Sequence, residues 1–121
     1  MQRARARQRG YDHAWEKAAH NFRALNPLCI GCLAIGVTRR ADTVDHVVPH
    51  RGDKGLFWDR SNWQSCCEWH HNSIKATLEL QWARGIIEDN ALRLNSIEAI
   101  KLTRQRHRPM IGIDGYPISG T

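Results

Sequence analysis

The stretch Val44-Asp45-His46-Val47-Val48-Pro49 sets a carboxylate beside an imidazole within a β-branched segment. Residues 43–48 alternate as a short strand does, and Pro49 ends the strand because proline cannot donate to a sheet. Successive side chains of a strand point to opposite faces, so Asp45 and His46 diverge unless the strand twists or bulges. Because such distortions are frequent near active sites, this segment is the first candidate for chemistry.

Two short-spaced pairs of potential metal ligands flank this strand. Cys29-Ile30-Gly31-Cys32 precedes it, and Cys67-Glu68-Trp69-His70 follows it. Three cysteines and one histidine in two such pairs are a ligand set that a tetrahedral structural zinc accepts. Gly31 would supply backbone freedom for a tight metal knuckle. A disulfide and idle buried thiols are the alternatives to zinc.

The doublet Cys66-Cys67 leaves the third cysteine ligand open. Cys66 could pair with His70 at a longer spacing, but adjacent side chains in extended backbone cannot both point at one ion. The two-residue spacing favours Cys67 as the ligand. Cys66 would then be a small buried hydrophobic residue, which is the common environment of a free cysteine.

A chain of 121 residues is long enough for one small domain. We expect a flexible basic arm at residues 1–10, one domain at residues 11–108 and an irregular Pro- and Gly-rich tail at residues 109–121. A long ordered loop is expected over residues 50–61. Helical spacing and capping signals predict three helices, from Asp12 to Asn26, from about Glu68 to Arg84 with a stop at Gly85, and from Ser96 to about Arg106. The first of these helices is expected to cover the core and not to carry chemistry.

The net charge of +6, from 18 Lys and Arg against 12 Asp and Glu, favours a polyanionic partner. Nucleic acid is the first candidate, an anionic membrane the second, and a merely soluble basic surface the alternative. No apolar run approaches the roughly 20 residues that span a bilayer, and no signal peptide is apparent. We therefore expect a cytoplasmic protein with reduced thiols. Basic residues crowd the first ten positions, as Arg3, Arg5, Arg7 and Arg9.

These pieces join further motifs in one composite pattern. In chain order it reads Val44-Asp45-His46-Val47-Val48-Pro49-His50-Arg51-Gly52-Asp53, Leu56-Phe57-Trp58-Asp59, Asn62-Trp63-Gln64-Ser65, Cys67, His70-His71 and Lys75. The composite resembles the HNH endonuclease family, especially its small phage- and prophage-encoded members. The resemblance implies an α+β fold of the ββα-metal (His-Me finger) type, with a zinc knuckle and flanking helices. It also implies a DNA endonuclease that hydrolyses phosphodiester bonds with one divalent cation.

Carried over by position, the resemblance implies that Asp45 and His71 bind this cation and that His46 is the general base. Asn62 is implied to tie the loop between the strands and so to orient His46. The chemistry suits these residue types, because a neutral imidazole with an ordinary pKa of about 6.5 accepts a proton from water. Two protein ligands also leave coordination positions open for phosphate and water. We expect Mg²⁺ or Mn²⁺, with Co²⁺, Ni²⁺ or Zn²⁺ as alternatives.

The chain departs from the family pattern at two places. His70-His71 stands where members commonly have Cys followed by His, so the knuckle would use three cysteines and one histidine. Lys75 follows His71 by four residues where three is frequent, and both spacings keep it on one helical face. We expect Lys75 to contact a DNA phosphate, with a plain solvated lysine as the alternative.

Further DNA contacts are expected from residues that follow the first strand. His50 is assigned to the loop or the substrate and not to the metal, because Pro49 interrupts its four-residue spacing from His46. Arg51 and Arg60 would line the DNA path, although ordinary surface charge explains both arginines equally well.

Two other functions compete with the nuclease. A non-catalytic zinc-ribbon module would bind DNA through the knuckle and the basic arm, and an accessory protein of phage packaging would bind other phage proteins. The zinc-ribbon module leaves Asp45, His46 and His71 without a role, and the accessory protein predicts no cleavage with any divalent ion. With one active site per chain, a monomer that nicks one strand is the simplest expectation, and double-strand cutting would need a second protomer or a second encounter.

Overall fold

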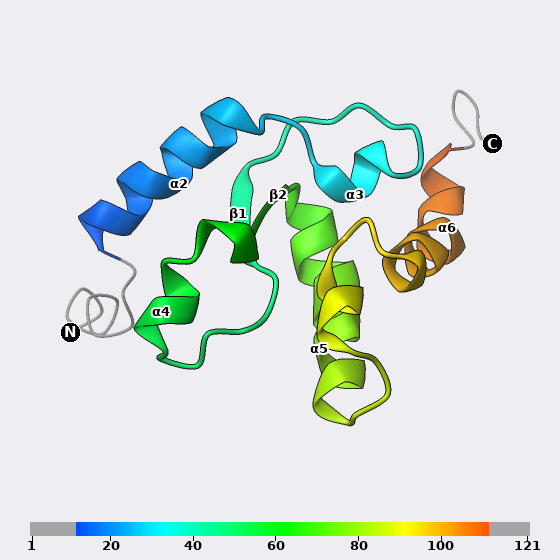
Figure 1. The fold of residues 1–121 in the computed structure, drawn as a ribbon. Helices are drawn as coiled ribbons and strands as arrows, with labels where there is room; N and C mark the ends of the chain where they lie inside the picture. The colour runs from blue at the N-terminus through cyan, green and yellow to red at the C-terminus, as the bar shows by residue number, and fades with distance from the viewer. Residues whose placement is uncertain (1–11, 112–121) are drawn as a thin grey trace, which may run out of the picture.

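A pair of short antiparallel strands forms the centre of the structure, a computed structural model that describes residues 12–111 (Figure 1). β1 (Thr43–His46) pairs with β2 (Trp63–Cys66). In this register Asp45 lies opposite Gln64. The basic arm expected at residues 1–10 lies outside the described residues. Among those residues, no helix is long and apolar enough to cross a membrane.

The connection between the strands contains two short helical turns, α4 (Lys54–Phe57) and η1 (Arg60–Asn62). Asp53 begins the first turn, because its Oδ1 accepts a hydrogen bond from the Leu56 amide at 3.0 Å. Asp59 begins the second turn in the same way. The loop expected over residues 50–61 is therefore partly helical, since these aspartates satisfy backbone donors that a loop would leave to water.

Helices surround the strand pair, with α2 on one side and α5 and α6 on the other (Figure 1). β2 leads into a π-helical turn, η2, which continues directly as α5. A hairpin followed by a helix is the α+β arrangement that the sequence predicted. The helices have the bounds α2 (His13–Leu25), α3 (Ile30–Leu33), η2 (His70–Lys75), α5 (Ala76–Ala83), η3 (Asp89–Leu92) and α6 (Ile97–Ile111).

The three expected helices are present, and their ends follow local signals. Asp12 caps α2 by accepting the Trp15 amide at 3.2 Å, and Gly85 follows α5 with a φ of +75°. The helix expected to end near Arg106 continues to Ile111. The prediction that the chain is irregular from residue 109 is therefore wrong for residues 109–111, because Pro109 does not stop the helix.

Two clusters of buried side chains lie on either side of the strand pair. The first cluster, called here the zinc-side core, contains the four cysteines together with Val47, Ile74, Leu78, Leu92, Leu94 and Ala99. The second, called here the aromatic core, consists of Trp15, Phe22, Phe57 and Trp63. The strands therefore separate a sulfur-rich region from an aromatic one.

Candidate active site and candidate zinc centre

Four potential zinc ligands converge in the zinc-side core. Cys29, Cys32, Cys67 and His70 are all buried, and their ligand atoms lie within 4.8 Å of one another. The Nδ1 of His70 is 3.5 Å from the sulfurs of Cys29 and Cys67. It is 3.6 Å from the Cys32 sulfur, and the Cys32 and Cys67 sulfurs are 3.9 Å apart.

These spacings suit a tetrahedral zinc ion. Bonds of about 2.3 Å to sulfur and about 2.0–2.1 Å to nitrogen place two sulfurs about 3.8 Å apart and a sulfur about 3.5 Å from the nitrogen. The observed sulfur–sulfur distance of 3.9 Å and the sulfur–nitrogen distances of 3.5–3.6 Å are close to these two values. The four side chains therefore fit a structural zinc.

Cys67, and not Cys66, takes part in this cluster. Cys66 is the last residue of β2, where it is fully buried, and burial raises the pKa of its thiol. Gly31 serves the cluster for a reason that differs from the one expected. It lies inside the short helix α3, and a Cβ on it would stand 2.3 Å from Cδ2 of His70. Gly31 thus makes room for the imidazole ring and does not provide an unusual backbone conformation.

Asp45 presents its two carboxylate oxygens to different partners. Oδ2 accepts hydrogen bonds from Lys75 Nζ at 2.9 Å and from Gln64 Nε2 at 2.9 Å. Oδ1 faces the Nδ1 of His71 at 3.3 Å. Burial opposes ionisation of Asp45, but the contact with His71 and the positive charge of Lys75 outweigh it and lower the pKa of this carboxyl. Asp45 is therefore an ionised side chain with one oxygen engaged and the other directed at His71.

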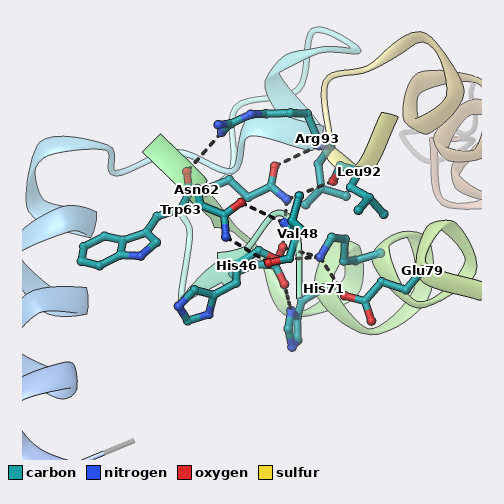
Figure 2. Close-up of polar contacts among 12 residues, drawn as sticks. His46, Val48, Asn62, Trp63, His71, Glu79, Leu92 and Arg93 are labelled. Atoms are coloured by element: carbon teal, nitrogen blue, oxygen red, sulfur yellow. Dashed lines mark hydrogen bonds and ion pairs between the residues drawn. The ribbon is translucent and has the colours of Figure 1, made fainter. Parts of the chain in front are cut away.

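Figure 2 shows the contact of His71 Nδ1 with the Asp45 carboxylate, but within the described residues this buried nitrogen makes no contact that has the geometry of a hydrogen bond. A buried polar atom without such a partner is unusual and calls for an explanation. Two neighbouring ligands of an octahedral ion with bonds of about 2.1 Å lie about 3.0 Å apart. The 3.3 Å between His71 Nδ1 and Asp45 Oδ1 is close to this value, so the pair fits one divalent cation.

His46 ends β1 on the aromatic side of the strand pair. Its Nε2 lies 2.9 Å from the carbonyl oxygen of Phe57. Because a carbonyl only accepts, Nε2 carries the proton and Nδ1 carries the lone pair of the neutral ring. The ring stacks on Trp15 with centroids 4.9 Å apart and 22° between the planes. Burial lowers the pKa of His46, so the imidazole is neutral near pH 7 and Nδ1 can accept a proton.

Asn62 joins the two ends of the connection between the strands (Figure 2). Its Oδ1 accepts the Val48 amide at 2.9 Å, and its Nδ2 donates to the Val48 carbonyl oxygen at 3.0 Å. The Asn62 carbonyl also accepts the Val47 amide at 2.7 Å. These bonds hold the backbone that directly follows His46.

An open cleft of about 820 Å³ brings Asp45, His46 and His71 to one surface. Although Asp45 and His46 leave β1 in different directions, both side chains border this cleft. His50 and Arg51 also border it. The expectation that the first helix only covers the core is incomplete, because α2 forms a wall of the cleft with Trp15, Glu16, Ala19 and Arg23.

Comparison with known proteins places this geometry in a family. No protein-family model matches the sequence, and no curated protein matches it. Among solved structures, the chain is similar to an HNH endonuclease of the deep-sea thermophilic bacteriophage GVE2, whose crystal structure contains a manganese ion. The two are 33% identical with a TM-score of 0.54, and the match covers 67% of this chain and 87% of that chain. The chain belongs to the HNH endonuclease family.

Lys75 of this HNH chain is buried and does not reach the surface where a DNA phosphate would bind. The side chain is 1% exposed. Its ammonium donates to Asp45 Oδ2 at 2.9 Å, to Glu79 Oε2 at 2.8 Å and to the His46 carbonyl oxygen at 2.8 Å. These three acceptors match the three donors of an ammonium group. The structure therefore contradicts both the phosphate contact and the solvated lysine that were considered from the sequence.

Of the other residues expected to contact DNA, His50 and Arg51 border the cleft and Arg60 does not. His50 lies beside His46, with ring centroids 5.0 Å apart, and its Nδ1 accepts the Gly52 amide at 3.0 Å. The Arg51 guanidinium stands over the Trp82 ring at 5.0 Å. Arg60 lies outside this cleft, with its guanidinium over the Trp63 ring at 5.4 Å. DNA contact by these three HNH residues stays a prediction.

Sequence reasoning missed the role of Gln64, which was noted only as part of a motif. Its Nε2 donates to Asp45 Oδ2 at 2.9 Å and to the Leu92 carbonyl oxygen at 3.2 Å, and its Oε1 accepts the Leu94 amide at 2.9 Å. Gln64 therefore connects Asp45 to the segment that follows α5. The strand register was the signal that could have found it, because Gln64 is the cross-strand neighbour of Asp45.

Proposed function

We propose that this HNH chain is a metal-dependent DNA endonuclease that hydrolyses phosphodiester bonds in the cleft between α2, β1 and η2. The observation that carries the proposal is the convergence of Asp45 Oδ1 and the buried His71 Nδ1 at 3.3 Å, with His46 at the same surface. Two protein ligands at the base of an open cleft leave room for phosphate and water.

A divalent cation held by Asp45 and His71 would supply positive charge to the phosphate oxygens and to the leaving oxygen. Mg²⁺ and Mn²⁺ are the proposed ions. The manganese ion in the related phage structure supports Mn²⁺ as a working cofactor. A separate structural zinc is proposed for Cys29, Cys32, Cys67 and His70, in agreement with their spacing.

His46 is the proposed general base. Its Nδ1 takes a proton from the attacking water while the water oxygen bonds to phosphorus and the bond from phosphorus to the 3′ oxygen breaks. The leaving 3′ oxygen takes a proton from solvent water, so the products carry a 5′-phosphate and a 3′-hydroxyl, as the family resemblance implies. The hydrogen bond from Nε2 to the Phe57 carbonyl holds the ring in place and stabilises the positive charge that the ring acquires.

Three further side chains are proposed as positioning residues. Asn62 holds the backbone after His46, as its bonds to Val48 indicate. Lys75 and Gln64 occupy Oδ2 of Asp45, which leaves Oδ1 directed at His71. Lys75 also binds the carbonyl oxygen of His46, so one ammonium connects the proposed metal ligand with the backbone of the proposed base.

DNA is the proposed substrate, and the positive charge of the chain supports this choice. His50 and Arg51 border the cleft and are proposed to contact the strand that is cut. Arg60 is proposed to contact the duplex away from the cleft, and the basic residues 1–10 to add phosphate contacts that carry no sequence information.

The test is cleavage of supercoiled plasmid in Mg²⁺ and in Mn²⁺ by the wild type and by His46→Ala. Loss of a general base is expected to slow nicking about 10²–10⁴-fold. His20→Ala is the matched control, because His20 is exposed on α2 and does not border the cleft. If folded His46→Ala with normal zinc content nicks as fast as His20→Ala, the proposed mechanism is wrong.

A further inference from the structure

The imidazole of His70 has two nitrogens, and they face different groups. Nδ1 faces the three sulfurs of the proposed zinc centre at 3.5–3.6 Å. Nε2 lies 3.1 Å from Oγ1 of Thr103, a residue of α6. His70 and Thr103 are both fully buried, so water does not compete for this contact. α6 lies beyond residues 11–82, where the sequence resembles its family.

The position of the proton follows from the second contact of Thr103. Its hydroxyl donates to the Ala99 carbonyl oxygen at 2.8 Å. A hydroxyl has a single proton, so toward His70 the Thr103 oxygen can only accept. Nε2 of His70 therefore carries the ring proton, and Nδ1 carries the lone pair directed at the sulfurs.

Two neighbours also restrict the position of the ring. The His70 ring lies directly over Gly31, where a Cβ would stand 2.3 Å from Cδ2 and 2.5 Å from Nε2. Trp69 packs against the ring edge-on, with centroids 4.8 Å apart. With the ring held between these groups, the acceptor at Thr103 determines which tautomer is stable.

We propose that Thr103 sets the His70 tautomer that presents Nδ1 to the zinc, which makes α6 part of the zinc centre. Histidine ligands generally donate their second nitrogen to a hydrogen-bond acceptor, and that partner raises metal affinity. The proposal goes beyond nuclease activity and does not depend on it. A chain that bound zinc but cleaved no DNA would leave it intact.

The test compares the zinc affinities of Thr103→Val and the wild type in competition with a chromophoric chelator at fixed pH. Valine keeps the shape of threonine and removes the acceptor, and zinc affinity is expected to fall about 10–100-fold. Thr103→Ser restores the hydroxyl and is expected to restore most of the affinity. Thr77→Val is the control, because Thr77 Oγ1 also donates to a carbonyl oxygen one turn back, that of Ser73 at 3.1 Å, but accepts from Arg106 at 2.9 Å and not from a histidine.

Equal zinc affinity in Thr103→Val and Thr77→Val would overturn the proposal, even if the Thr103 variant melts at a lower temperature. A second measurement needs no variant. Long-range ¹H–¹⁵N NMR of the zinc-loaded wild type is expected to show His70 protonated at Nε2 and metal-bound at Nδ1. The opposite assignment would also overturn the proposal, so the test stands even if Thr103→Val does not fold.

Discussion

His70 and His71 are neighbours in one π-helical turn, yet they belong to two different sites. His70 is fully buried with three cysteines around it, whereas the side chain of His71 is 42% exposed and borders an open cleft with one carboxylate. Four converging protein ligands close a metal site, and two leave it open. The number of ligands and the access of solvent, and not the type of residue, distinguish the imidazole of the proposed zinc centre from that of the proposed catalytic site.

The two sites are expected to differ most in how much each contributes to the stability of the fold. Cys29→Ser is expected to lose zinc and to unfold, because structural zinc contributes about 10–16 kcal/mol in small zinc domains. That is comparable with the whole stability of a domain, about 5–15 kcal/mol. His71→Ala is expected to keep one zinc and its fold but to nick plasmid at least about a hundredfold more slowly, since a catalytic cation contributes several kcal/mol. Metal content, thermal unfolding and cleavage distinguish the two variants.

Cys66→Ser is the control for the zinc side, because Cys66 is equally buried but lies outside the cluster. It should retain zinc. The comparison fails if His71→Ala loses the tightly bound zinc, or if Cys29→Ser keeps it.

Lys75→Met is expected to have the next largest effect, at the proposed metal site of Asp45 and His71. Removing the ammonium leaves Asp45 and Glu79 without their cation, and breaking a buried ion pair costs about 3–5 kcal/mol of stability. Under conditions where the variant is folded, kcat should fall because Asp45 loses the ammonium that positions it. The salt dependence of DNA binding, measured without metal, should stay the same because Lys75 does not contact DNA. Lys101→Met, an exposed lysine on α6, is the control. A reduced salt slope in Lys75→Met would restore the phosphate contact that the structure contradicts.

Gly31→Ala should have a smaller effect, confined to the closed site. The new Cβ would force the His70 ring to move, and such overpacking costs about 1–3 kcal/mol. Zinc affinity should fall with stability. Gly55→Ala is the matched change, because its Cβ meets only Asp53 Oδ1 at 3.3 Å, and stability should change by less than about 1 kcal/mol. Chelator competition and thermal melts measure both variants, and equal effects would show that His70 can move freely.

Arg51→Met should have the smallest effect and should leave both metal sites intact. If Arg51 contacts one phosphate, the slope of log K against log salt decreases by about 0.9. Arg104→Met, on the exposed side of α6, should leave the slope unchanged. Filter binding or fluorescence anisotropy over a salt series measures the slopes, and identical slopes for both variants would remove Arg51 from the DNA surface.

The features that depend on short spacing could be predicted from the sequence. The zinc ligands stand in two pairs, each within one turn, so their spacing alone brings the members of a pair together. The helices at Asp12 and Gly85 carry capping or breaking residues at their ends. The strand expected over residues 43–48 is present but ends at His46, before Pro49. The strand motif singled out Asp45 and His46, whereas the family resemblance supplied His71, which lies too far along the chain for local reasoning.

The features that depend on tertiary contacts could not be predicted in this way. Lys75 has the spacing of a surface residue, and its burial follows from the packing of η2 against β1. The stacking of Trp15 on His46 depends on the angle at which α2 crosses the strand pair. Thr103 meets His70 only because α6 folds back over η2, and its hydroxyl resembles that of any helical threonine in the sequence.

The π-helical turn at His70–Lys75 makes the site sensitive to the length of the chain as well as to its composition. A π turn is an α-helix that accommodates one extra residue. Deleting one residue within 72–74 would restore α-helical bonding and rotate Lys75 by about 100° relative to His71. Family members with the shorter spacing of three residues would therefore place their basic residue at a different angle around the helix from Lys75.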